Sequence, residues 1–184
     1  MFNIAVIVGS LRKDSFNKKL FFALDKLNHP QLTFHLLDLT NIPLYNQDNE
    51  QPLPAPVVTF KQEIESSDGV LFVTPEYNRS VPGMLKNIID WGTRPYGKNV
   101  WLNKPTAIIG TSPGAIGTAA AQAHLRSILV AIGAILLGLP EVYLVFKKEL
   151  IDDSHTITNE DTRKFLQQFL DSYGDWIKKH PKTL

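Results

Sequence analysis

Short hydrophobic runs alternate with longer segments of helical spacing along the whole chain. Five runs have the length and composition of β-strands, and they cover residues 3–8, 33–37, 69–73, 106–110 and 142–146. The first, third and fourth runs are apolar enough to lie in the middle of a sheet. The run 33–37 interleaves polar and apolar residues, which indicates a strand at a sheet edge. The pattern therefore predicts a sheet with buried central strands.

Five segments between and after these runs have the hydrophobic spacing of helices, and they cover residues 16–27, 57–66, 82–91, 118–137 and 160–179. The segment 118–137 is apolar almost all the way round, so we expect another copy of this chain to cover it. The stretch 41–56 has four prolines and no periodicity. A loop of that length is usually functional or an interface arm.

Strands that alternate with helices are typical of βαβ units and a parallel sheet covered on both faces. We therefore expect one α/β domain over residues 1–184, a flavodoxin-like three-layer sandwich with a five-stranded parallel sheet in the order 2-1-3-4-5. In such a fold the ligand lies at the carboxyl ends of strands one, three and four.

Composition narrows the class of partner. The 184 residues carry a formal net charge of +1 and are 43% hydrophobic, which argues against disorder and against a nucleic-acid or membrane partner. A small-molecule partner is expected instead. The apolar start of the chain resembles no leader peptide, so we expect a cytoplasmic protein.

The residue types also limit the chemistry. The chain has no cysteine, which excludes thiol redox chemistry and thiolate metal ligands. Its five histidines have no spacing typical of metal ligands, so no metal site is expected. If the protein transfers electrons, a bound cofactor must carry them.

The stretch GSLRKDSFN, residues 9–17, follows the first apolar run and precedes a helical segment. A turn at this place directs free backbone N–H groups and the positive end of a helix toward one point. The hydroxyls of Ser10 and Ser15, the amide of Asn17 and the guanidinium of Arg12 would make that point suitable for a phosphate. The spacing matches neither a dinucleotide fingerprint nor a Walker A loop, so a mononucleotide is favoured.

Two further loops follow the third and fourth strands, TPEYNRSVPGMLKNIIDW at 74–91 and TSPGAIGTAAAQAHLR at 111–126. In the first, Tyr77 offers a face for stacking and Asn78 a polar contact. In the second, Gly114 and Gly117 allow the backbone to approach a ring edge closely. A phosphate turn, a ring platform and a close-approach loop at one edge of a sheet together favour flavin mononucleotide (FMN).

These three loops resemble the signature loops of the NADPH-dependent FMN reductase family, closest to its bacterial chromate and quinone reductase branch, with azoreductases as relatives. The resemblance covers almost the whole chain. It implies a flavodoxin-like fold and a homodimer or homotetramer. It also implies FMN contacts from two groups of residues: Ser10, Arg12, Ser15, Phe16 and Asn17 at the phosphate, and Pro75, Glu76, Tyr77, Asn78, Ser112, Gly114 and Gly117 around the ring.

The resemblance further implies an FMN-dependent NAD(P)H oxidoreductase that transfers hydride by a ping-pong mechanism. The acceptors expected for such an enzyme are quinones, azo compounds, chromate or free flavins. We expect no side chain to act as an indispensable acid or base, because hydride transfer needs binding and orientation of the rings above all. Glu76 is the carboxylate that comes nearest to such a catalytic role. Because the flavin ring must accept electrons, we expect the charge of Glu76 to be directed away from the ring.

Three alternatives have features of their own. Gly110 to Gly114 match the G-x-S-x-G elbow of serine hydrolases around Ser112, with candidate partners Asp152, Asp153, His155 and His180 downstream. The residue after Ser112 is Pro113, however, which has no N–H for an oxyanion hole. A non-enzymatic flavodoxin electron carrier would be strongly acidic, unlike this chain. Asp38, after the second strand, could bind a ribose in a dinucleotide site, but without the glycine fingerprint we expect it to cap a loop.

Overall fold

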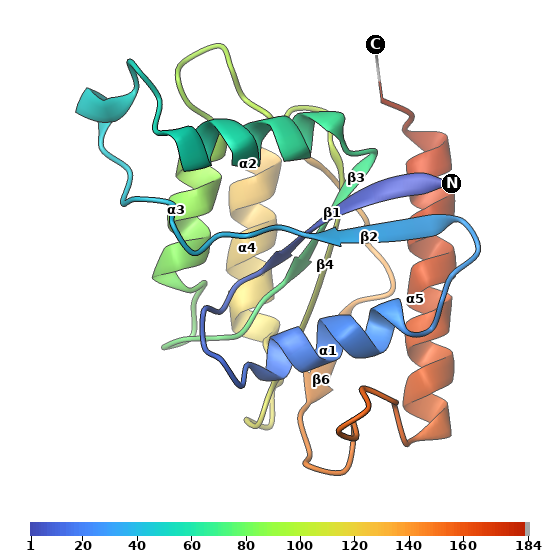
Figure 1. Ribbon diagram of the computed structural model, residues 1–184. Helices are drawn as coiled ribbons and strands as arrows, with labels where there is room; N and C mark the ends of the chain where they lie inside the picture. The colour runs from blue at the N-terminus through green and yellow to red at the C-terminus, as the bar shows by residue number, and fades with distance from the viewer. Residues whose placement is uncertain (183–184) are drawn as a thin grey trace.

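The computed structural model describes residues 1–182 and has three layers, a parallel sheet between two layers of helices (Figure 1). The strands are β1 (Phe2–Val8), β2 (Leu32–Leu36), β3 (Gly69–Val73), β4 (Pro105–Ser112), β5 (Ile135–Leu136) and β6 (Val142–Val145). Their order is β2-β1-β3-β4-β5, with β6 also paired to β4. The predicted fold class and strand order are therefore confirmed.

The fifth position of the sheet is divided between two short strands. Pro105 and Thr106, at the start of β4, pair with β5, and the residues from Ile109 to Ser112, at its end, pair with β6. Only the second of these strands lies in a run predicted from the sequence, 142–146. Because β6 pairs with the carboxyl end of β4, it completes the edge of the sheet at which a ligand is expected.

The helices are α1 (Phe16–Asp25), α2 (Ala55–Ser66), α3 (Gly83–Gly92), α4 (Ala119–Ala131) and α5 (Glu160–Lys179), and η1 (Gln47–Asn49) is a short 3₁₀ turn. Helices α1 and α5 cover one face of the sheet, and α2, α3 and α4 cover the other (Figure 1). Within residues 1–182, no helix combines the length and the apolar character that a membrane span requires.

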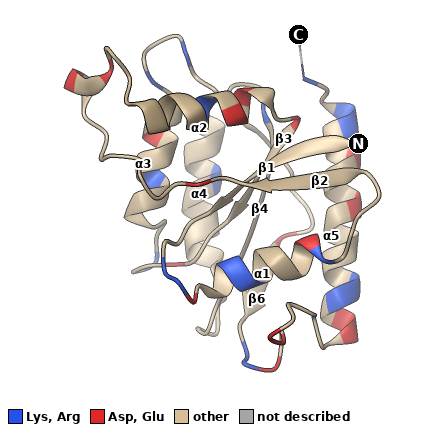
Figure 2. Cartoon of the chain, viewed as in Figure 1, with Lys and Arg blue, Asp and Glu red and all other residues tan. Residues whose placement is uncertain are grey.

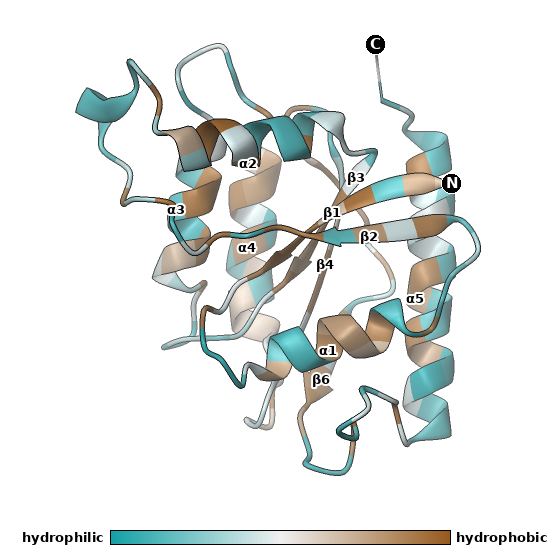
Figure 3. Cartoon of the chain, in the orientation of Figure 1, coloured by the Kyte–Doolittle hydropathy of each residue, from teal (hydrophilic) through white to brown (hydrophobic). Residues whose placement is uncertain are grey.

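Alternation along the central strands builds two cores. In β1, Ile4, Val6 and Val8 face α1 and α5, while Ala5 and Ile7 face the other helical layer. Both sets are buried because the strand has helices on both sides. Figure 3 shows the mainly hydrophobic interiors of β1, β3 and β4.

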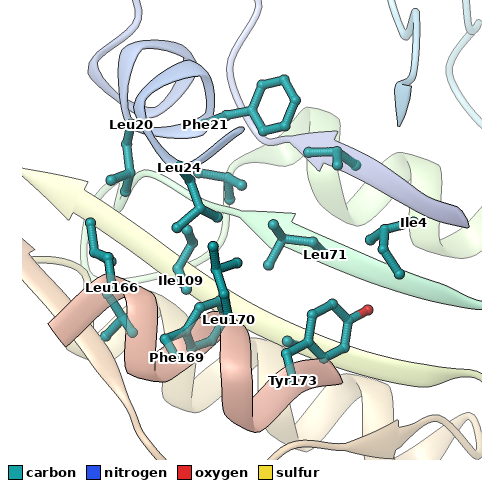
Figure 4. Packing of buried hydrophobic residues seen from close by; sticks show 14 of the residues in the cluster. Ile4, Leu20, Phe21, Leu24, Leu71, Ile109, Leu166, Phe169, Leu170 and Tyr173 are labelled. Atoms are coloured by element: carbon teal, nitrogen blue, oxygen red, sulfur yellow. The ribbon is translucent and has the colours of Figure 1, made fainter. Parts of the chain in front are cut away.

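The core between the sheet and the first pair of helices is shown in Figure 4. Leu20 and Leu24 of α1 and Phe169 of α5 point toward the same side of the sheet, where they meet Leu71 of β3. All four side chains are almost fully buried. This packing holds the start of α1 close to the carboxyl ends of the strands.

The loop before α2 is ordered against α3. The carbonyl oxygen of Pro43 accepts hydrogen bonds from Asn87 Nδ2 and Trp91 Nε1, both at 2.8 Å. Tyr45 packs edge-on against Trp91 with 5.0 Å between ring centroids. The loop therefore has a defined position on the surface beside α3, although Leu44 is mostly exposed.

The prediction of one helix over 118–137 was wrong in its last part. Helix α4 ends at Ala131, and Gly133 follows with φ +86°. Its N–H donates to Val130 O at 3.0 Å, and Ala134 N–H donates to Leu129 O at 3.0 Å, which is the Schellman pattern of a helix C-terminus. The chain then enters β5, so part of the apolar segment forms the sheet and not a helix surface.

Two buried lysines predict a rise of stability with pH. Lys61 donates to the carbonyl oxygens of Gly92 and Lys98, and Lys104 donates to that of Ser67. Burial lowers the pKa of each to about 8. The unfolded chain therefore binds more protons than the folded chain above pH 8, so the free energy of unfolding should increase from about pH 8 to about pH 10.

Urea unfolding at pH 7.5, 8.5 and 9.5 measures this slope. Lys104→Met should reduce it, whereas Lys178→Met, a matched change at an exposed lysine of α5, should keep the wild-type slope. The window stops at about pH 10 because burial raises the pKa of Tyr173, which favours the unfolded state above that pH. A wild-type stability that does not change between pH 8 and 10 would contradict the prediction.

Candidate functional site

Three loops meet at the carboxyl end of the sheet and form one cleft of about 200 Å³, called here the cofactor cleft. The residues that line it are Ser10, Arg12, Ser15, Phe16, Asn17, Pro75, Glu76, Tyr77, Thr111, Ser112 and Pro113. Most residues that the sequence analysis assigned to FMN are therefore brought together. Thr111 and Pro113 also line the cleft, although neither was assigned. Asn78, Gly114 and Gly117 belong to the same loops but do not line it.

The loop between β1 and α1 provides the donors for an anion. Ser15 is the N-cap of α1, and its Oγ accepts a hydrogen bond from Lys18 N at 3.3 Å. Ser10 Oγ likewise accepts from Arg12 N at 3.3 Å. Since each hydroxyl accepts from the backbone, its own proton can be donated to a ligand. The N–H groups of Phe16 and Asn17 lie in the first turn of α1, where they have no partner within the helix.

Two aromatic rings support Arg12 at this place. Its guanidinium carbon lies 5.2 Å from the centroid of the Phe16 ring. Phe16 in turn stacks on Phe146 with 4.2 Å between centroids and 25° between planes. Phe146, just after β6, donates its N–H to Ser112 O at 2.8 Å. The stack restrains the guanidinium beside the phosphate loop, and sequence reasoning missed Phe146 because its contact is with a residue far away in the chain.

Asn17 joins α1 to the end of β4. Its side chain is buried, and its Nδ2 donates to Thr111 O at 2.9 Å while its Oδ1 accepts from Thr111 N at 3.0 Å. These two bonds use Oδ1 and one of the two N–H groups of Nδ2, so a contact of the amide with a phosphate stays a prediction. Asn17 can also offer an anion its own backbone N–H, in the first turn of α1.

The loop after β3 contains a tight hairpin between Tyr77 and Ser80, whose backbones exchange hydrogen bonds of 3.0 and 3.1 Å. Asn78 and Arg79 at its tip have φ values of +52° and +63°, as a type I′ turn requires. Left-handed backbone at two non-glycine residues costs free energy. The turn leaves Tyr77 half exposed at the edge of the cofactor cleft, where its ring can face a ligand.

Glu76 connects this loop to α4. Its side chain is only 8% exposed, and Oε2 accepts hydrogen bonds from Ala120 N at 3.0 Å and Ala121 N at 3.1 Å. Oε1 lies 3.4 Å from Arg79 Nη1. The carboxylate therefore binds the positive end of α4. Its hydrogen bonds are directed to the protein, as the sequence analysis expected of its charge.

The loop after β4 is closed on itself and on β6. Ser112 Oγ donates to Gly117 O. Gly117 has φ +58°, and a Cβ there would lie 2.9 Å from the carbonyl carbon of Tyr143. The structure thus requires glycine at 117 for packing against β6, while Gly114 has space around it. A contact of Gly114 or Gly117 with a cofactor stays a prediction.

The geometry does not support a serine hydrolase. The Ser112 hydroxyl donates its proton to a carbonyl oxygen, which leaves no hydrogen bond to a general base. His155 packs against Phe22 with 5.1 Å between ring centroids, and His180 packs against Trp176 at 4.1 Å. Neither histidine therefore serves Ser112.

The donor set of the cofactor cleft fits the phosphate of FMN. One guanidinium, two hydroxyl protons and the N-terminus of α1 face the cleft, and the carboxylate that lines it is bound to α4. Such a set selects a dianion that is held by hydrogen bonds and charge together. Pro75 and Tyr77, from the loop after β3, provide an apolar surface for a flat ring.

Comparisons with known proteins agree with this geometry. Residues 2–149 match the family model described as NADPH-dependent FMN reductase. The chain is 51% identical over 175 residues to 2-hydroxy-1,4-benzoquinone reductase of a Burkholderia species, which covers 95% of this chain and 96% of that protein. It is also 46% identical over 179 residues to a quinone reductase of Pseudomonas putida, with coverage of 97% and 96%.

Solved structures show the same likeness. FerB, described as a flavoenzyme NAD(P)H:(acceptor) oxidoreductase from Paracoccus denitrificans, matches with a TM-score of 0.95 and 50% identity over 99% of this chain and 100% of its own. An azoreductase from Bacillus anthracis matches with a TM-score of 0.58 at 18% identity, covering 97% of this chain and all of its own, which shows a shared fold alone.

Proposed function

The chain belongs to the NADPH-dependent FMN reductase family, and we propose that its cofactor cleft binds FMN and that the protein reduces quinones with NAD(P)H. The observation that supports this most is the convergence of three loops on one cleft, whose lining holds both phosphate donors and ring contacts. A small hydrophobic acceptor such as a quinone suits a chain of formal net charge +1 better than a protein partner does. The lack of cysteine suits work in the cytoplasm.

Each part of the cleft has a separate task in this proposal. When bound, FMN supplies a ring that accepts hydride from NAD(P)H and delivers it to the acceptor. Ser10, Arg12 and Ser15 hold the phosphate, and Pro75 and Tyr77 support the ring. The two substrates then meet the ring, in turn, at the opening of the cleft beside the exposed Tyr77. Because one opening serves both substrates, we expect ping-pong kinetics.

The visible spectrum of the purified protein tests the proposal. Flavin bands near about 375 and 450 nm are expected, and NADPH followed by a quinone should bleach and then restore them. A protein that binds FMN but is not bleached by NADPH or NADH would be an electron carrier of the flavodoxin type. A chain that binds no FMN at saturating concentration would refute the proposal.

We predict that Glu76→Gln lowers kcat by tens of fold at most. The amide keeps an oxygen that can accept from Ala120 and Ala121, and only the charge at the α4 N-terminus is lost. Steady-state kinetics with NADPH and a benzoquinone, on protein with equal FMN content, measure the effect. Tyr77→Leu is a companion variant that removes the ring at the cleft edge and tests positioning instead of charge.

A loss of about 10⁴-fold in kcat for Glu76→Gln, with FMN still bound, would mean that this carboxylate is an essential acid or base. That result would contradict the mechanism. In a ping-pong mechanism at one opening, NADP⁺ competes with the quinone. Inhibition by NADP⁺ that is not competitive with the quinone would contradict the shared opening.

We also propose that the protein forms a homodimer or homotetramer. Within the described residues, Val130 on the outer side of α4 and Leu139 in the loop before β6 are large apolar side chains that are 62% and 75% exposed. Apolar groups of this size favour a contact with a second copy, for which two-fold symmetry is the commonest solution. Sedimentation at micromolar concentration should show a dimer or tetramer, and Val130→Glu should shift it toward monomer. A stable wild-type monomer would disprove this.

A further inference from the structure

A second cleft lies on the other side of the phosphate loop, where β1 and β2 end. Its volume is about 290 Å³, and we call it the β2-end cleft. The residues that line it are Val8, Ser10, Leu11, Arg12, Lys13, Lys18, Leu36, Leu37, Asp38, Leu39 and Thr40. Ser10 and Arg12 line both clefts. A single extended ligand can therefore contact both at once.

The β2-end cleft is positively charged on the side of α1. Lys13 and Lys18 are exposed there and join Arg12, and Figure 2 shows these basic residues in the loop before α1 and at its start. The carboxylate in the lining, Asp38, accepts hydrogen bonds from Thr40 N at 3.0 Å and Thr40 Oγ1 at 2.6 Å. Asp38 thus caps its loop, as the sequence analysis expected. Three cations against one capped carboxylate favour an anionic ligand.

The same cleft has apolar walls that the protein does not cover. Leu11 is 59% exposed and Leu36 is 37% exposed, and both belong to the lining. Beneath them the buried side chains of Val8, Leu37 and Leu39 form an apolar floor. Exposed leucines at a cleft with cations nearby suit a ligand that has a flat apolar ring and a phosphate.

The assignment of the neighbouring residues indicates which phosphate. Ser10 and Arg12 are assigned to the phosphate of FMN, so an anion held by Lys13 and Lys18 is a second group beside it. Of the two co-substrates, only NADPH carries a further dianion next to an aromatic base, the 2′-phosphate of its adenosine. Lys13 and Lys18 stand across from the end of β2 in the β2-end cleft. The nicotinamide end of the same molecule can then extend past Ser10 and Arg12 toward the cofactor cleft.

We propose that the β2-end cleft binds the adenosine 2′-phosphate of NADPH, and that Lys13 and Lys18 make the enzyme prefer NADPH to NADH. This inference rests on the proposed function for the identity of the co-substrate. It assigns a task to two lysines and two leucines that the cofactor cleft does not use.

Direct binding to the FMN-loaded enzyme tests the inference. By calorimetry, 2′,5′-ADP should bind more tightly than 5′-AMP. Lys13→Gln combined with Lys18→Gln should weaken 2′,5′-ADP about tenfold and change 5′-AMP less than about twofold. Lys19→Gln has the same charge change on the next residue of α1, outside the lining, and should leave both affinities unchanged. Leu11→Ser should weaken both nucleotides alike.

Kinetics supply the second readout. In the double variant the KM for NADPH should rise about tenfold, while kcat, the KM for NADH and the FMN content stay as in the wild type. Added salt should raise the KM for NADPH more than that for NADH in the wild type and should lose this difference in the double variant.

Two outcomes would overturn the inference: no binding of 2′,5′-ADP to the wild type, or an equal loss for NADPH and NADH in the double variant. Loss of FMN from the double variant would also overturn it, since the lysines would then serve the cofactor phosphate. Failure of the proposed function gives a different result, because a wild type without FMN or quinone reductase activity can still be titrated with 2′,5′-ADP.

Discussion

Replacing Arg12 with alanine is expected to weaken FMN binding roughly 10- to 150-fold without unfolding the domain. A charge-assisted hydrogen bond to a partly buried phosphate contributes about 1.5 to 3 kcal/mol, and the guanidinium is held for that contact by the stack of Phe16 on Phe146. Because Arg12 is exposed, its removal leaves no cavity in the core. Quenching of flavin fluorescence during titration of the apoprotein measures the dissociation constant.

Three further variants make this prediction specific. Lys19→Ala removes a nearby positive charge from α1 without touching the cofactor cleft and should keep the wild-type affinity. Arg12→Lys keeps a charge but not the planar group on Phe16, so it should recover only part of the binding. Phe146→Ala should weaken FMN less than Arg12→Ala does, because it acts through Phe16. Unchanged FMN affinity in Arg12→Ala would refute the assignment of the phosphate.

Asn17→Leu is expected to lower the free energy of unfolding by about 2 to 5 kcal/mol. The substitution keeps the approximate size of the side chain but leaves the N–H and C=O of Thr111 without their partners, and each buried polar group left unpaired costs about 1 to 3 kcal/mol. FMN content after purification should fall as well, since the start of α1 is no longer held to the end of β4. Urea unfolding of the apoprotein gives the stability change.

The matched control for this variant is Asn49→Leu, in η1 and away from the sheet and the cofactor cleft. An exposed residue there should change stability by less than about 0.5 kcal/mol. Excess FMN should raise the melting temperature of Asn17→Leu if the cleft still forms, by mass action. If the stability of Asn17→Leu equals that of the wild type, the amide does not make the connection between α1 and β4.

Periodicity was sufficient for the layers and the strand order. Strand β1 has apolar residues on both of its faces, for example Ile4 on one and Ile7 on the other. A strand of this kind is buried between two layers of helices. The three loops could also be placed, because parallel strands direct all their carboxyl ends to one edge. Family membership followed from those loops and is confirmed by the match over residues 2–149.

The end of α4 has a local signal in the sequence, a glycine at position 133. Gly133 follows the last helical turn, as glycine does at many helix C-termini, and the apolar residues beyond it continue the pattern without continuing the helix. An apolar run has no period when every position is apolar, so helix and strand cannot be distinguished within it. Here the residues after Gly133 form a strand, because β5 pairs with the start of β4.

The sequence by itself determined the sheet, the three loops and the residue types offered to a phosphate and a ring, because these depend on periods and turns within a few residues. Only the tertiary structure decided where those side chains point. Asn17 binds Thr111, 94 residues away, and Glu76 binds the start of α4, 44 residues away. Phe146, just after β6 and distant in the sequence, supports Arg12 through Phe16. Such contacts join loops across a folded core, so no local pattern in the chain can record them.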